Sequence, residues 1–194
     1  GAGRTLELVV GQKVARSMNA SCEGYALGEH ELWCHSVAAA MAAERLGKYA
    51  EVAIPGSAFT AALLHDIGKL ILNRHIGDGT AQEIRRLIVE EKILYLEAER
   101  RVLGIDHAEV GGAVARHWKF PEILVSAIEH HHDPDVEPGV ILDAVHIANA
   151  VAKLIGVGLG TEEMYMKASA DAAKRLKLTT TGLKSLCAAV QEDL

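Results

Sequence analysis

Between residues 57 and 73 the chain carries apolar side chains at helical spacing, and a few polar side chains interrupt them. The apolar positions recur with the offsets of a buried helix face: Phe59, Leu63, Ile67, Leu70 and Ile71. Just before this run, the segment Pro55-Gly56-Ser57 provides a stop and an N-cap signal. The pattern therefore predicts a central buried helix that runs to about Asn73.

The same helical periodicity recurs along most of the chain, without a convincing strand alternation. Gly47 and Gly104 stand where helices end, and Asp106 with Glu109 has the spacing of a capping box. The charges on residues 94–102 are expected to form a solvated face. The predicted helices cover residues 5–18, 28–46, 57–73, 80–92, 94–102, 106–118, 121–132, 138–155, 161–176 and 181–190. The sequence thus predicts an all-α fold, a single compact helical bundle over residues 1–194.

Three polar residues of the central helix share one surface, because Lys69 lies three residues after Asp66 and four after His65. A carboxylate buried without a partner costs several kcal/mol or shifts its pKa. Two interpretations are open. His65 and Asp66 coordinate a metal ion together, or they form a hydrogen bond inside an ordinary helix.

Histidine is unusually frequent, with ten residues between His30 and His146. Taken alone, His30, His75 and His117 are expected on the surface. The helix that follows Asp106 repeats His107, Val110, Val114 and Trp118 along one side, which places His107 at the mouth of a buried face. In the run at residues 130–132, at most two imidazoles can enter one site, and we choose His131 and His132 because they directly precede the Asp-Pro stop.

Composition narrows the classes of function. The net charge is −6 and no basic cluster stands out, so no nucleic-acid partner is expected. Three scattered cysteines without a CxxC motif favour a reducing, cytoplasmic location. No apolar run has the ~20 residues of a transmembrane helix and no signal peptide is recognisable, so no membrane partner is expected. Because the chain starts with Gly1-Ala2-Gly3, we expect a tag remnant or a truncation.

Five segments in a fixed order resemble the HD superfamily of metal-dependent phosphohydrolases. The nearer match is its HDOD family, the HD-related output domains of bacterial signalling proteins. The segments are Leu32–Ser36, Ala62–Lys69, Leu103–Gly111, Trp118–Glu122 and Ala127–Pro134. The resemblance covers about residues 5–155, which leaves residues 156–194 as C-terminal helices outside it. We expect the N-terminal part of the family domain to be missing.

The site also resembles that of the related HD-GYP phosphodiesterases, which hydrolyse cyclic di-GMP. That similarity implies an additional ligand at Glu31 and a phosphate-facing lysine at Lys69. The main metal ligands that it implies are His35, His65, Asp66, His107, His131 and His132. The chain departs from the pattern in two places. No Gly-Tyr-Pro follows the histidine pair, and Asn149 stands where the superfamily usually has a metal-binding Asp; its amide can ligate but brings no charge.

The implied ligand set suits iron, manganese, zinc or nickel better than magnesium, in a mononuclear or dinuclear centre. With two ions, Asp66 would bridge them and Lys69 would neutralise a phosphate oxygen, so these two residues are the catalytic candidates.

Three functions follow as alternatives. The first is a signal-transduction output domain with an HD-type metal site, which binds a signalling partner protein or a small phosphorylated ligand. The second is a metal-dependent phosphohydrolase or phosphodiesterase that acts on a nucleotide or cyclic dinucleotide. The third is a histidine-rich core without metal. We favour the first, because Asn149 and the missing Gly-Tyr-Pro argue against full activity.

Overall fold

The computed structural model describes residues 17–158, 160 and 168–194, and no strand forms within these ranges. The prediction of an all-α fold is confirmed. The elements in chain order are η1 (Glu23–Tyr25), α2 (Glu31–Leu46), α3 (Ser57–Leu64), α4 (Ile67–Leu72), α5 (Asp78–Glu91), α6 (Tyr95–Leu103), α7 (His107–His117), α8 (Glu122–Glu129), α9 (Val140–Leu154), α10 (Ala170–Arg175) and α11 (Thr180–Gln191).

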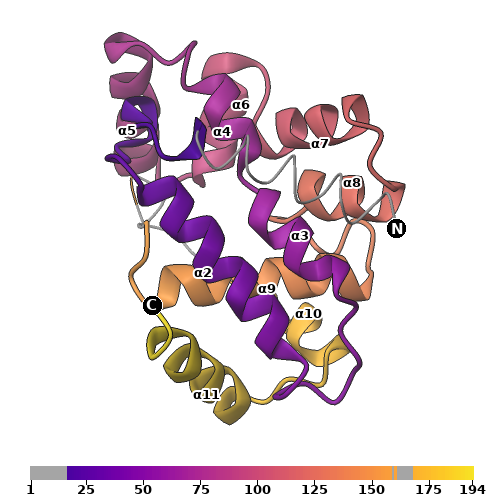
Figure 1. Cartoon of the computed structure of the whole chain (residues 1–194). Helices are drawn as coiled ribbons and strands as arrows, with labels where there is room; N and C mark the ends of the chain where they lie inside the picture. The colour runs from indigo at the N-terminus through magenta and orange to yellow at the C-terminus, as the bar shows by residue number, and fades with distance from the viewer. Residues whose placement is uncertain (1–16, 159, 161–167) are drawn as a thin grey trace.

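Helices α2, α3 and α9 form the centre of the molecule (Figure 1). Helix α2 packs along both α3 and α9, and α8 contacts α3 and α9. Helix α7 packs against α8 and α4, while α5 and α6 pair at one end and α10 and α11 pack against α9 at the other (Figure 1). The segments that carry the candidate ligands therefore converge on the centre.

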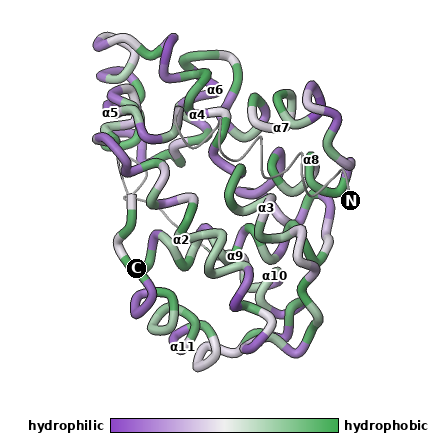
Figure 2. Tube along the Cα trace, viewed as in Figure 1, coloured by the Kyte–Doolittle hydropathy of each residue, from purple (hydrophilic) through white to green (hydrophobic). Residues whose placement is uncertain are grey.

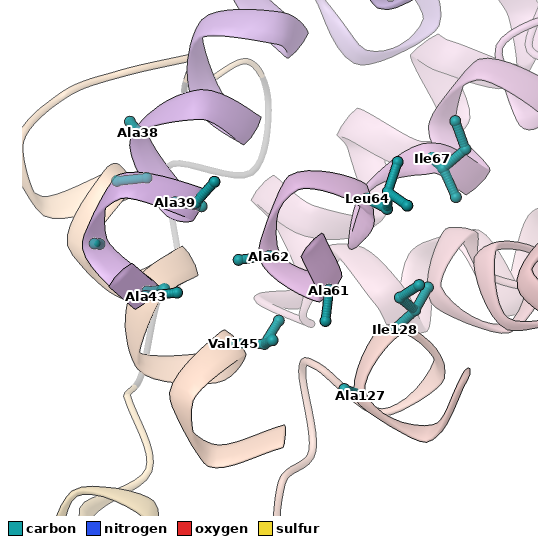
Figure 3. Packing of buried hydrophobic residues seen from close by; sticks show 14 of the residues in the cluster. Ala38, Ala39, Ala43, Ala61, Ala62, Leu64, Ile67, Ala127, Ile128 and Val145 are labelled. Atoms are coloured by element: carbon teal, nitrogen blue, oxygen red, sulfur yellow. The ribbon is translucent and has the colours of Figure 1, made fainter. Parts of the chain in front are cut away.

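Small side chains line the contacts between the central helices. Figure 3 shows Ala39 and Ala43 of α2, Ala61 and Ala62 of α3, and Val145 of α9 in one contact region, and all five are buried. An alanine extends only one carbon from the backbone, so helices that meet through alanines can approach closely. This close packing brings side chains of neighbouring helices within reach of one another.

The predicted central helix is wrong in one respect: it breaks at His65 and Asp66 into α3 and α4. Asp66 has φ −97° and ψ 12°, outside the α-helical region. Directly after the break, Gly68 lies against the backbone of His107, where an added Cβ would overlap the carbonyl oxygen. The break thus lets α4 pack against α7 and turns the polar pair toward the centre.

The predicted buried stripe of this segment is also partly wrong. Phe59 and Ile71 are exposed by 37% and 42%, whereas Ala58, Ala61 and Ala62 are completely buried. Figure 2 shows hydrophobic residues along α3 and α9 in the middle of the fold. Periodicity alone predicted that the large apolar residues face the core. The helices pack so closely, however, that small residues occupy the buried face instead.

Helix α7 also buries small residues where larger apolar ones were predicted. The predicted stripe of Val110, Val114 and Trp118 is only half-buried, and the buried face contains Gly111, Gly112 and Ala115. A Cβ added to Gly112 would lie 2.7 Å from Glu129 Cβ of α8. The contact with α8 therefore requires small residues on α7.

Most of the other predicted helices appear with bounds shifted by a few residues, and the capping box of Asp106 and Glu109 forms as predicted. The helix predicted over residues 5–18 lies almost wholly outside the described residues. Of the helix predicted over residues 161–176, the described part contains α10. A bilayer-spanning helix is not found among the described elements, all of which are too short or too polar.

Candidate metal centre

The carboxylate of Asp66 lies at the centre of a cluster of imidazoles. Its Oδ2 atom is 3.3 Å from His65 Nε2 and 3.6 Å from His35 Nε2. Its Oδ1 atom is 3.4 Å from His107 Nε2 and 3.6 Å from His131 Nε2. These residues come from α2, the α3–α4 junction, the start of α7 and the segment after α8, so distant parts of the chain meet at one carboxylate.

The cluster contains two groups of donor atoms, and within each group the atoms lie within 4.8 Å of one another. We name them site A and site B. Site A consists of His35, His65 and Asp66 Oδ2, and site B consists of Asp66 Oδ1, His107, His131 and His132. Because a different oxygen faces each group, the Asp66 carboxylate is placed to bridge two ions.

Three of the imidazoles are oriented by backbone carbonyls through Nδ1. His65 and His131 each lie 2.6–2.7 Å from the carbonyl oxygen three residues earlier. His35 Nδ1 lies 2.9 Å from the carbonyl oxygen of Val157. A carbonyl only accepts hydrogen bonds, so each Nδ1 carries a proton, and in the neutral ring each Nε2 then keeps a lone pair that faces Asp66. Metal-ligating histidines are typically held in this way.

The residues present fit a divalent transition metal. Three buried atoms of the cluster have no hydrogen-bond partner among the described residues: His65 Nε2, His131 Nε2 and Asp66 Oδ1. Buried polar atoms nearly always have a partner, and a cation is a suitable one for lone pairs. A tetrahedral zinc ion separates its nitrogen and oxygen ligands by about 3.4 Å, as calculated from bond lengths of about 2.0–2.2 Å. The separations of 3.3–3.6 Å around Asp66 match this value.

Glu99 orients the fourth imidazole, that of His107, and is a functional residue that the sequence pattern did not indicate. We expected the charges of residues 94–102 to be solvated, but the Glu99 side chain is completely buried. Its carboxylate accepts hydrogen bonds from His107 Nδ1 at 2.7 Å and from the Tyr25 hydroxyl at 2.5 Å. The one available signal was its place beside Tyr95 and Ala98 on the buried face of α6.

Burial and neighbouring charge set the protonation states of the cluster. Burial lowers the pKa of His35 to about 4 and that of His131 to about 3. The pKa of His132 is also well below its usual value, through burial and the nearby His131. Burial alone would raise the pKa of Asp66, but the neighbouring His65 imidazole and the Lys69 ammonium outweigh burial and hold that pKa well below the usual range. His35, His131 and His132 are therefore neutral and Asp66 is ionised at neutral pH, which are the forms that bind a metal ion.

Lys69 and Tyr25 border the cluster. Lys69 Nζ lies 2.8 Å from Asp66 Oδ2 and 5.7 Å from the centroid of the Tyr25 ring. Lys69 is buried, so its ammonium is directed at the carboxylate rather than at solvent. Its predicted contact with a phosphate stays a prediction.

Asn149 and Glu31, the two additional candidates, lie in different surroundings. Asn149 is buried on α9, with Oδ1 3.1 Å from His35 Nε2. Glu31 is exposed, and its carboxylate accepts a hydrogen bond from Gly28 N at 2.8 Å, so the structure does not bring it into either site.

The glycine-rich loop after α9 lies over His35. A Cβ added to Gly158, which has φ +59°, would come within 2.7 Å of His35 Cβ. The backbone can therefore approach the ring closely enough for the Val157 carbonyl to orient it.

The segment that carries His131 and His132 is anchored from α9 and α10. His130 points away from the centre, 3.9 Å from Glu129. The ring of His146 lies 2.8 Å from the carbonyl oxygen of His131, and its Nε2 accepts a hydrogen bond from Ser169 N. A pair of hydrogen bonds from Arg175 to Asp143, at 2.6 and 2.8 Å, ties α10 to α9. These contacts hold the ligand segment from a part of the chain that the sequence analysis had not connected to the site.

The sequence is similar to a known domain family and to a known protein. The HDOD domain model matches residues 1–134. Ribonuclease Y of Thermus thermophilus is 30% identical over 158 residues, which are 81% of this chain and 21% of that protein. The chain therefore spans about a fifth of the length of this relative.

Solved structures show the same fold. An HDOD domain protein of unknown function from Geobacter sulfurreducens superposes with a TM-score of 0.62 and 26% identity, covering 86% of this chain and 63% of that one. A candidate signal transduction protein from Marinobacter aquaeolei VT8 superposes with a TM-score of 0.67 and 20% identity, covering 82% and 36% respectively. The arrangement of helices is thus found in other proteins.

Proposed function

The chain belongs to the HDOD family, and from this premise we propose that it is a signal-transduction output domain built around a divalent metal centre. The observation that carries the metal centre is the convergence of imidazole Nε2 atoms on the buried Asp66 carboxylate, with each Nδ1 of three rings on a backbone carbonyl and that of His107 on Glu99. An ordinary histidine core would pair both ring nitrogens with protein groups, whereas Nε2 of His65 and Nε2 of His131 have no such partner among the described residues.

A regulatory or structural role for the centre is supported by its closed surroundings. His35, His65, Asp66, His107 and His131 are at most 1% exposed, and Lys69 and Asn149 are at most 5% exposed, whereas His132 is only partly buried. Structural metal sites are closed, whereas catalytic sites keep an open coordination position for substrate. The neutral Asn149 beside His35 also provides less charge for holding a second ion than a carboxylate would.

The donor set suits iron, manganese, zinc or nickel. Bound there, such an ion would supply Lewis acidity and would tie four segments of the chain together. The chain's own residues orient the ligands, and burial keeps His35, His131 and His132 neutral.

The output of the domain is proposed to be the binding of a signalling partner protein or a small phosphorylated ligand, in the cytoplasm of a bacterium. A resemblance to a candidate signal transduction protein at the level of the fold is consistent with this role. In this proposal neither nucleic acid nor membrane is a partner.

Hydrolysis of a phosphodiester is the second candidate function. It is favoured by the 30% identity to a protein named a ribonuclease, over a region that is 21% of that protein. In this alternative Asp66 would hold the metal, and Lys69, 2.8 Å from Asp66, would contact a phosphate oxygen after moving from the carboxylate.

The two candidates are separated by one set of measurements. Protein purified without a histidine tag is analysed for metals and assayed with nucleotides, cyclic dinucleotides and RNA in the presence of Mn²⁺ or Fe²⁺. We expect one or two ions per chain, loss of metal in Asp66→Ala, retention in the exposed control Asp78→Ala, and no turnover. Turnover that disappears in Asp66→Ala would establish the enzyme instead, and a chain that binds no metal would contradict both candidates.

A further inference from the structure

We propose that the two halves of the centre are unequal: a divalent transition metal binds first at site B, and site A takes an ion only weakly. The inference rests on the metal centre proposed above and specifies which of its residues hold the ion.

Site B offers the larger set of ligands. It contributes three imidazoles and one carboxylate oxygen, which is a complete tetrahedral set. Site A contributes two imidazoles and the other oxygen of the same carboxylate. Among the described residues, its next donor is the amide of Asn149, whose Oδ1 is 3.1 Å from His35 Nε2 and is neutral.

Neighbouring charged side chains also favour binding of the first cation at site B. The Glu99 carboxylate lies directly behind it, 2.7 Å from His107 Nδ1. The Lys69 ammonium lies 2.8 Å from the Asp66 oxygen that faces site A. A cation at site B is therefore flanked by two carboxylates, whereas a cation at site A would approach an ammonium and share a carboxylate with the first ion.

Hydrogen bonding satisfies two of the three ligand atoms of site A without an ion, and His65 Nε2 is the one left without a partner among the described residues. Lys69 donates to Asp66 Oδ2, and the amide of Asn149 can turn its NH₂ group toward the lone pair of His35 Nε2. Site B has fewer such donors. Asp66 Oδ1 and His131 Nε2 are both buried without a hydrogen-bond partner among the described residues, whereas Nε2 of His107 and Nε2 of His132 lie 2.9 Å apart, within hydrogen-bond distance of each other. Site B therefore leaves two buried atoms for a cation to satisfy, whereas site A leaves one.

The first test compares one ligand from each site. Metal-stripped protein without a histidine tag is titrated with Zn²⁺ by calorimetry, and folding of every variant is checked by circular dichroism. We expect one tight equivalent in the wild type, a loss of affinity of roughly 100-fold or more in His132→Ala, and a tight equivalent that persists in His35→Ala. Loss in His35→Ala with retention in His132→Ala, or two equally tight equivalents in the wild type, would overturn the inference.

The second test adds a ligand rather than removing one, so it does not depend on a destabilising truncation. Asn149→Asp places a carboxylate beside His35, and we expect the second equivalent of Zn²⁺ to bind at least roughly 10-fold more tightly while the first is little changed. A strengthened first equivalent would assign that ion to site A. A wild-type chain that binds no ion would contradict the proposed metal centre itself, a result distinct from binding at the wrong site.

Discussion

At the scale of single residues, the buried imidazoles differ from ordinary core histidines in how their two nitrogens are used. In His35, His65 and His131 one nitrogen is fixed to a backbone carbonyl and the other is directed at Asp66. In His107 a buried carboxylate, Glu99, takes the place of the carbonyl. A charged partner strengthens the basicity of the ring that it holds, so Glu99 has the greatest expected influence on metal affinity outside the ligands.

Glu99→Gln is therefore expected to weaken binding of the first metal ion by roughly 10- to 100-fold, because the amide is isosteric but removes the charge behind His107. Calorimetric titration with Zn²⁺ measures the change. Glu97→Gln is the matched control, since Glu97 lies on the same helix but is exposed and paired with Arg101. Equal Zn²⁺ affinities of the wild type and Glu99→Gln would show that the charge of Glu99 does not contribute to metal binding.

Protonation of the same residues predicts a pH dependence of the metal-free protein. The folded-state pKa values of about 4 for His35 and about 3 for His131 lie below the ordinary value of 6.5. Below pH 6.5 the unfolded chain takes up protons that the folded chain does not, so stability is full above that pH and falls as the pH decreases toward 4. From the lowered pKa values of the two residues together, we expect the free energy of unfolding to decrease by about 2 kcal/mol between pH 7 and 5.5.

Urea denaturation with a chelator present, at several pH values, measures this loss. His35→Gln should remove about half of the pH-dependent part, whereas His75→Gln, which changes an exposed histidine, should leave the profile as it is. A free energy of unfolding that is constant from pH 7 to 5.5 would contradict the assignment of neutral buried imidazoles.

At the scale of elements, glycines and alanines determine how closely the ligand-bearing helices approach. Gly68 of α4 lies against the backbone of α7, and Gly112 of α7 lies against α8. Alanines perform the same role between α2 and α3 (Figure 3). Since the imidazoles around Asp66 come from several segments, the positions of these helices decide whether they meet.

Gly68→Ala should consequently be severely destabilising. The new Cβ would overlap the carbonyl oxygen of His107 and lie 2.8 Å from the backbone nitrogen of Gly111, and backbone cannot move aside as a flexible side chain can. We expect a loss of about 3 kcal/mol in the free energy of unfolding, at the upper end for overpacking, together with weaker metal binding. Gly79→Ala is the control, because nothing lies within 4 Å of its Cβ and alanine favours the helix by up to about 1 kcal/mol. Similar stabilities of the two variants would disprove the close contact.

At the scale of the whole molecule, the candidate centre lies where α2, the α3–α4 junction, α7 and the segment after α8 meet (Figure 1). An ion that binds only the folded chain stabilises it by mass action. The C-terminal part of the chain also contributes, since α10 contacts α9, Ser169 Oγ donates a hydrogen bond to Asp135, and Arg175 donates one to the carbonyl oxygen of Pro134. Binding of the proposed ion is therefore expected to raise the stability of the whole molecule.

Removal of metal with a chelator should lower the unfolding temperature, and Zn²⁺ or Mn²⁺ at about 100 times the dissociation constant should restore about 2.7 kcal/mol of stability. Differential scanning calorimetry follows both steps. Asp66→Ala, which lacks the central carboxylate, should not respond to metal, whereas Asp78→Ala should respond like the wild type. A response of Asp66→Ala equal to that of the wild type would place the ion elsewhere.

The sequence by itself determined the all-α class, most helix positions, the capping box at Asp106 and the ordered segments that resemble the HDOD family. These features depend on local periodicity, on capping chemistry and on short motifs, all of which can be seen within one stretch of chain. The convergence of His35, His107 and His131 on Asp66 was inferred from that resemblance, because no local pattern relates residues so far apart.

Only the tertiary structure decided the break at Asp66, the use of alanine and glycine faces where larger apolar residues were predicted, and the place of Glu99 behind His107. The anchoring of His131 through His146 and Ser169 likewise became visible only there. The physical reason is that burial and hydrogen bonding between distant segments depend on how helices pack. A charged residue such as Glu99 has the same local pattern whether it faces solvent or the interior.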